Sequence, residues 1–106
     1  MARGINKKSV LLTPKMQELM DIVGEQIRLA RLRRRLTTQI VADRAGISRA
    51  TLWKIENGDG SVAVGFYLKV LHALNLEKDI LKLAADDELG RFIQDSELLK
   101  KGKRSK

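Results

Sequence analysis

The chain has 106 residues, a net charge of +8 and 43% hydrophobic residues, which is enough for one small domain with a modest core. It contains no cysteine and one proline, so disulfides and thiolate zinc sites are excluded, and we expect an all-helical fold. No apolar run approaches the roughly 18 residues that span a membrane, and the first residues lack the apolar core of a signal peptide. We therefore expect a cytoplasmic protein.

A first helix is predicted from Pro14 to about Arg34. Thr13 can cap it, and a proline fits the first helical turn. Four apolar residues then recur at helical spacing and form one face that we expect to pack in the core: Leu19, Val23, Ile27 and Ala30. The helix is long enough for its first turns to project beyond a compact core.

Two short helices follow, over residues 38–45 and 49–57. Each has a capping residue before it and a glycine after it: Thr37 and Gly46 for the first, Ser48 and Gly58 for the second. This arrangement is typical of a helix-turn-helix, whose second helix enters the major groove of DNA. On a chain with this positive charge, it predicts a sequence-specific binder of double-stranded DNA.

The helical period divides residues 49–57 into a core side, with Leu52 and Ile55, and an exposed side. The exposed side carries Arg49, Ala50, Trp53, Lys54 and Asn57. Arg49 can bond guanine O6 and N7, and Lys54 can contact a base edge or a phosphate. Ala50 permits close approach to the bases, and Thr51 can donate to a phosphate from the flank. The alternatives are that Arg49 and Lys54 are ordinary surface cations, and that Trp53 packs along its own helix rather than on DNA.

A fourth helix is predicted after Ser61, which we expect to cap it. Its core residues would be Val64, Leu68, Leu71 and Leu74, and Asn75 would end it in a left-handed conformation. A fifth helix begins near Glu77 and carries Ile80, Leu81 and Ala84.

Asp86 or Asp87 caps a sixth, weaker helix with Leu89, Phe92 and Ile93, and we expect disorder from Lys100 onward. The predicted organisation is a basic flexible arm at residues 1–13, a helix-turn-helix domain at 14–85, and an extension with a disordered basic tail at 86–106. Residues 77–97 carry seven acids between the basic segments, which indicates separate faces for DNA and for a protein partner. The alternative is that the basic ends only increase solubility.

The segment GEQIRLARLRRRLTTQIVADRAGISRATLWKIENG resembles the helix-turn-helix domain of the Xre/Cro–cI family of bacterial and phage repressors. The resemblance covers about residues 20–76. It implies a five-helix, lambda-repressor-like domain that binds a palindromic operator as a homodimer. It also implies a structural ion pair between Arg31 and Glu56. The residues expected at the DNA are Thr38, Gln39, Ser48, Arg49, Ala50, Thr51, Trp53, Lys54 and Asn57.

Two positions depart from the family pattern. Thr38 stands where the family usually has a glutamine that touches DNA, with Gln39 one step later. Arg35 stands where the family often has glycine, so a left-handed backbone would be costlier there, although the arginine adds a cation near phosphate.

The segment GSVAVGFYLKVLHALNLEKDILKLAADDELGRFIQD resembles a narrower group, the HipB-like antitoxins encoded beside HipA-type kinase toxins. This resemblance implies that residues 77–97 and the C-terminal tail contact a kinase toxin, while the chain represses its own operon.

Other classes of function are predicted less directly. A helical adaptor that binds protein partners without reading DNA would use the same fold, with the acidic segment as its support. A nonspecific nucleic-acid chaperone would need mainly basic charge. We expect no enzyme and no cofactor, because the chain has one histidine, no glycine-rich phosphate loop and no metal-ligand spacing.

Overall fold

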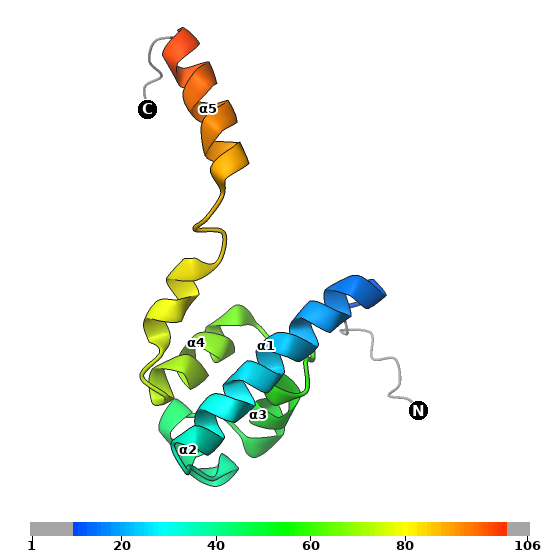
Figure 1. The fold of residues 1–106 in the computed structure, drawn as a ribbon. Coiled ribbons are helices and arrows are strands. Elements are labelled where there is room, and N and C mark those ends of the chain that lie inside the picture. The colour runs from blue at the N-terminus through cyan, green and yellow to red at the C-terminus, as the bar shows by residue number, and fades with distance from the viewer. Residues whose placement is uncertain (1–9, 102–106) are drawn as a thin grey trace.

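The computed structural model describes residues 10–101, and all regular structure in this range is helical. Six elements follow one another along the chain: α1 (Pro14–Arg33), α2 (Thr38–Ala45), α3 (Arg49–Glu56), α4 (Val64–Ala73), the 3-10 helix η1 (Glu77–Lys82) and α5 (Glu88–Lys101). Helices α1 to α4 pack together, η1 lies against α4, and α5 projects away from them (Figure 1). The all-helical fold with a helix-turn-helix is therefore confirmed. The predicted arm falls mostly outside the described residues, as do residues 102–106.

Side-chain caps start the first three helices where the sequence predicted them. Thr13 Oγ1 accepts a hydrogen bond from the Met16 N–H at 3.2 Å, and Thr37 Oγ1 accepts one from the Ile40 N–H at 3.1 Å. Ser48 Oγ caps α3 by accepting a hydrogen bond from the Thr51 N–H at 3.0 Å. Gly46 ends α2 at φ 70°, a left-handed conformation that glycine adopts without a steric penalty.

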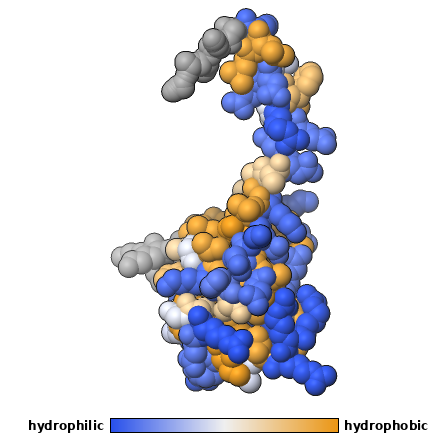
Figure 2. Space-filling model, turned by 90° about the vertical axis from the view of Figure 1, so that its left-hand side faces the viewer, coloured by the Kyte–Doolittle hydropathy of each residue, from blue (hydrophilic) through white to orange (hydrophobic). Residues whose placement is uncertain are grey.

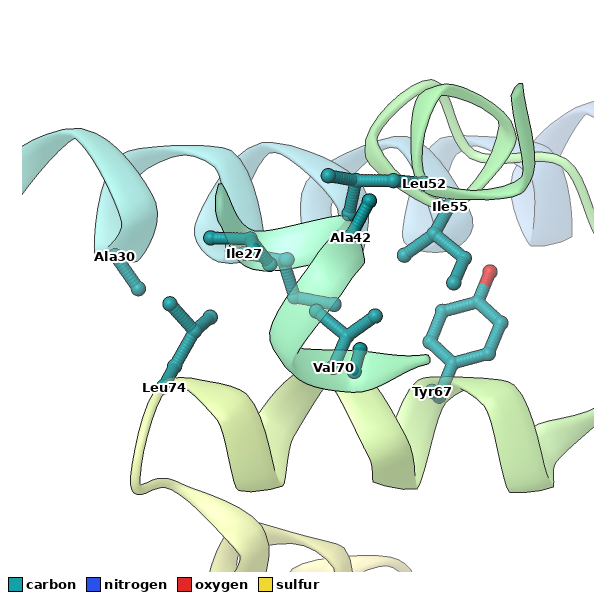
Figure 3. Close-up of a cluster of buried hydrophobic side chains, with 10 residues drawn as sticks. Ile27, Ala30, Ala42, Leu52, Ile55, Tyr67, Val70 and Leu74 are labelled. Carbon is teal, nitrogen blue, oxygen red and sulfur yellow. The ribbon is translucent and has the colours of Figure 1, made fainter. Parts of the chain in front are cut away.

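The core lies where α4 faces the first three helices (Figure 3). Tyr67, Val70 and Leu74 point from α4 toward side chains of the other helices. The buried hydrophobic residues are Ile27, Ala30, Val41, Ala42, Ala45, Leu52, Ile55, Tyr67, Val70 and Leu74. The buried hydrophobic residues of α1 lie in its C-terminal half, and Met20 packs partly against them. The first turns of α1 extend past the other helices (Figure 1), so Leu19 and Val23 are exposed rather than in the core as predicted.

The predicted start of α4 is wrong, and its predicted core face is confirmed at Leu71 and Leu74 but wrong at two other positions. The N–H and hydroxyl of Ser61 donate to Asp59 Oδ1 instead, at 2.8 and 2.6 Å, and α4 begins three residues later without a side-chain cap. Val64 and Leu68 are exposed. The buried face is rotated because Tyr67 turns inward, where its hydroxyl reaches the Asp59 carbonyl at 3.3 Å.

The fifth element is a short 3-10 helix rather than an α-helix, and Ala84 lies beyond its end with φ 60°. Long 3-10 helices are uncommon because their hydrogen-bond geometry is poor. Because η1 buries no residue, no packing contact stabilises a longer helix there. The sixth helix is longer than predicted. Asp87 Oδ1 accepts from the Gly90 N–H at 3.1 Å, and α5 continues to Lys101, so the expectation of disorder is wrong at Lys100 and Lys101.

Candidate nucleic-acid interface

Helix α3 is fixed from its inner side by two fully buried side chains, Leu52 and Ile55. Behind them, α1 approaches the end of α3 at Gly24, a buried glycine in the middle of α1. A Cβ at this position would lie 2.6 Å from the Glu56 carbonyl oxygen and 2.7 Å from that of Ile55. Glycine is therefore required by the close approach of the two backbones. We did not single out Gly24 from the sequence, although a glycine at mid-helix was a signal of such contact.

A buried ion pair joins the same two helices. Arg31 Nε donates to Glu56 Oε2 at 2.7 Å, and its Nη2 donates to Oε1 at 2.9 Å. The third donor, Nη1, bonds the Leu36 carbonyl at 3.1 Å. The two side chains are 10% and 7% exposed, and the hydrogen bonds to Glu56 raise the pKa of Arg31 above its ordinary value. The pair implied by the family resemblance thus connects α1, the loop before α2, and α3.

The loop after α3 is held by a second contact with α1. Gln17 Nε2 donates to the Gly58 carbonyl at 2.7 Å and to Asp21 Oδ1 at 2.9 Å. Gly58 has φ 78°, and a side chain there would collide with Asp21. This contact was not predicted, because it depends on the direction in which α1 crosses α3.

The outer face of α3, which we define as Arg49, Ala50, Trp53 and Lys54, points to solvent. Trp53 is 65% exposed. Within residues 10–101, no hydrogen bond or ion pair engages the side chains of Arg49 or Lys54. The outer face therefore presents the planar guanidinium of Arg49, the flexible ammonium of Lys54 and the methyl group of Ala50 together. These are the groups that proteins use to contact base edges and phosphates.

The remaining predicted DNA residues already have local hydrogen bonds. Ser48 caps α3, and its hydroxyl donates to Thr51 Oγ1 at 3.0 Å. Asn57 Nδ2 donates to the carbonyl of Trp53 at 2.8 Å. Gln39 Nε2 donates to Asp43 Oδ1 at 2.8 Å. Each of these residues still has donors or acceptors that could bond a second partner. They lie beside the outer face and can add contacts to those of Arg49 and Lys54.

The start of α2 lies next to a cationic turn. Thr38 is half-buried there, and the preceding residues Arg33, Arg34 and Arg35 are exposed. Arg34 Nη1 donates back to the Ala30 carbonyl at 2.9 Å. Arg35 adopts φ 56°, the left-handed conformation for which glycine is better suited. Positive charge at a helix N-terminus is suited to binding phosphate.

None of the helices in residues 10–101 is long and apolar enough to cross a membrane. No group of three or more His, Cys, Asp or Glu residues in the same range is arranged to hold a metal ion.

Comparison with known proteins identifies the fold's family. A family model described as a helix-turn-helix domain matches residues 22–82, more than half of the chain. A comparison with curated proteins gave no match. The matched range contains the ion pair, the outer face of α3 and the cationic turn. The chain belongs to the helix-turn-helix domain family and is, in general terms, a DNA-binding regulator.

Proposed function

We propose that the chain is a repressor of the Xre/Cro–cI type that recognises a specific double-stranded operator through the outer face of α3. The observation that carries this proposal is the contrast between the two sides of α3. Its inner side is fixed by Leu52, Ile55 and the Arg31–Glu56 pair, whereas its outer face presents Arg49 and Lys54 with no described partner. A rigid helix with unpaired donors binds without reorganising first.

Each outer-face residue has a distinct role in this proposal. Arg49, in the first turn of α3, donates to guanine O6 and N7 in the major groove. Ala50 lets the helix sit deep and contacts a thymine methyl. Lys54, one turn later, bonds a base edge or a phosphate. Arg33, Arg34 and Arg35, before α2, contact DNA phosphates. These contacts fix the orientation of α3 on the duplex but carry no sequence information.

The operator is proposed to be palindromic and bound by a homodimer. Two recognition helices related by a two-fold axis enter successive major grooves on one side of the duplex. Their half-sites would then lie about 34 Å apart, roughly one helical turn. We propose a binding role only, with no catalysed reaction and no cofactor.

Selection from a library of random duplexes, followed by binding measurements, tests the proposal. Joint substitution Arg49→Ala and Lys54→Ala should reduce the preference for the selected site over random duplex by about fivefold to 150-fold, since a bidentate base contact contributes about 1–3 kcal/mol. Lys78→Ala with Lys82→Ala on η1 removes the same charge and is the control.

The outcomes separate sequence reading from other modes of binding. An unchanged preference in the Arg49 and Lys54 variant would contradict recognition by α3. It would favour the alternative of a helical adaptor for protein partners. Equal affinity for all duplexes in the unmodified chain would instead favour a nonspecific nucleic-acid binder.

A second, narrower proposal is that the chain is an autorepressor and the antitoxin of a HipA-type kinase. Acidic residues exposed on η1 and α5, among them Asp79 and Asp95, support a separate surface for a protein partner. Footprinting upstream of the chain's own gene tests self-repression. A kinase gene beside it whose product binds the chain would support the antitoxin role, and a failure of that product to bind would contradict it.

A further inference from the structure

Helix α5 has no extensive packing contact with another helix in residues 10–101. Every residue from Glu88 to Lys100 is exposed except Gly90, and the helix stands apart from the packed unit of α1 to α4 (Figure 1). Hydrophobic side chains gather along this projecting helix in Figure 2. A solitary helix of 14 residues is marginally stable in water, so something must pack on α5 if it is to persist.

Four of the five large apolar residues of α5 share one side, and the fifth, Leu98, lies on the opposite side. At 100° per residue, five positions fall within an arc of about 120°: Leu89, Phe92, Ile93, Ser96 and Leu99. We call this set the α5 stripe. Its four hydrophobic members are each more than half exposed. Gln94 lies on the opposite side of the helix and is also exposed.

The two ends of α5 carry opposite charge, and Arg91, Asp95 and Glu97 lie between them. Asp86, Asp87 and Glu88 are acidic at the start, whereas Lys100 and Lys101 are basic at the end. A second copy in antiparallel orientation would place each acidic end beside a basic end. A parallel copy would instead place like charges together at both ends. Charge complementarity therefore favours a second copy of this chain, in one orientation.

We propose that α5 pairs antiparallel with α5 of a second copy through the α5 stripe. With the stripe centred near residue 94, Leu89 of one copy faces Leu99 of the other, and Phe92 faces Ser96. Glu88 then lies near Lys100 of the second copy. Because α5 projects away from the unit that contains α3 (Figure 1), the pairing leaves the outer face of α3 accessible. This interface deepens the proposed homodimer and rests on that proposal.

Sedimentation velocity of the full chain over a range of concentrations tests the surface. Phe92→Glu adds a charge inside the α5 stripe, and Gln94→Glu adds the same charge on the opposite side of the same helix. We expect Phe92→Glu to weaken self-association by about tenfold or more, and Gln94→Glu to leave it unchanged. Circular dichroism checks that both variants remain helical.

Two charge reversals test the orientation. Glu88→Lys alone and Lys100→Glu alone place like charges together at both ends of an antiparallel pair, so each should associate more weakly than the unmodified chain. An equal mixture of the two variants restores opposite charges at both ends and should regain association. In a parallel pair, each single variant would keep like charges at both ends and associate no more weakly than the unmodified chain, and the mixture would associate more tightly than the unmodified chain.

Several results would overturn the proposal. These are a chain that stays monomeric, a dimer that Phe92→Glu does not weaken, or a mixture that does not regain association. A monomer that instead binds a kinase through α5 would assign the stripe to a different protein. Binding of each variant to a duplex carrying a single selected half-site is measured in parallel. If the half-site is bound normally while the chain stays monomeric, or while Phe92→Glu does not weaken the dimer, the α5 interface is contradicted and DNA recognition by α3 is not.

Discussion

Substitution of Gly24 by alanine tests whether the close contact of α1 with α3 positions α3. The new Cβ would lie 2.6 Å from the Glu56 carbonyl oxygen, 2.7 Å from the Ile55 carbonyl oxygen and 2.8 Å from the Glu56 carbonyl carbon. All three neighbours are backbone atoms, so no side chain can rotate away. The helices must separate by roughly 0.5–1 Å, in an interior packed closely enough to respond to one methylene.

Two opposing effects determine the size of the change. Alanine favours a helix interior over glycine by about 1 kcal/mol. Overpacking of a well-filled contact costs about 1–3 kcal/mol, and the shift also moves Glu56 relative to Arg31. We expect the steric effect to win, with a net loss of about 1–2 kcal/mol in the free energy of unfolding.

Urea unfolding followed by circular dichroism measures this loss, and Gly65→Ala provides the matched control. Gly65 lies in the first turn of α4, and a Cβ there would meet nothing within 4 Å. The same substitution at Gly65 should leave stability unchanged or raise it slightly. If Gly24→Ala proved as stable as the unmodified chain, the close approach of the two backbones would not be what positions α3.

Three further substitutions have defined outcomes. Arg31→Met leaves Glu56 buried without its partner and should lower the free energy of unfolding by about 3–5 kcal/mol in urea; a loss below about 1 kcal/mol would contradict a structural role for the pair. Burial, with a smaller contribution from Asp59, raises the pKa of Tyr67 above its ordinary value of 10.0. The folded chain therefore holds this proton more tightly, so stability should fall as pH rises above 10. Tyr67→Phe should flatten that slope in unfolding measurements at several pH values, and an unaltered slope would exclude Tyr67 as its source. Arg35→Gly removes a left-handed strain of about 1 kcal/mol and should raise the melting temperature while weakening DNA binding; a lower melting temperature would contradict this.

The helix boundaries around the recognition helix were predictable because they depend on local chemistry. A hydroxyl one residue before a helix and a glycine after it act within a single turn, and Thr37, Ser48 and Gly46 act in this way in the structure. The division of α3 into a buried and an exposed side was predictable for a similar reason, because the helical period alone fixes it.

The errors arose where distant contacts decide the outcome. The rotation of α4 depends on Tyr67 reaching Asp59, which the spacing of its leucines does not reveal. Gly24 at mid-helix indicates a close contact, but the helix that it contacts is known only once α1 and α3 are placed side by side. The length of α5 was underestimated because its charged end carries few apolar residues, although lysine is a good helix former.

The contacts that hold α3 in place all lie away from its outer face. Leu52 and Ile55 enter the core, the contact with Gly24 lies at the helix end, and Glu56 is held by Arg31. Substitutions at Arg49 or Lys54 should therefore change DNA preference while leaving stability nearly constant, since exposed positions without such contacts contribute little to folding. Operator preference could then be altered without rebuilding the fold.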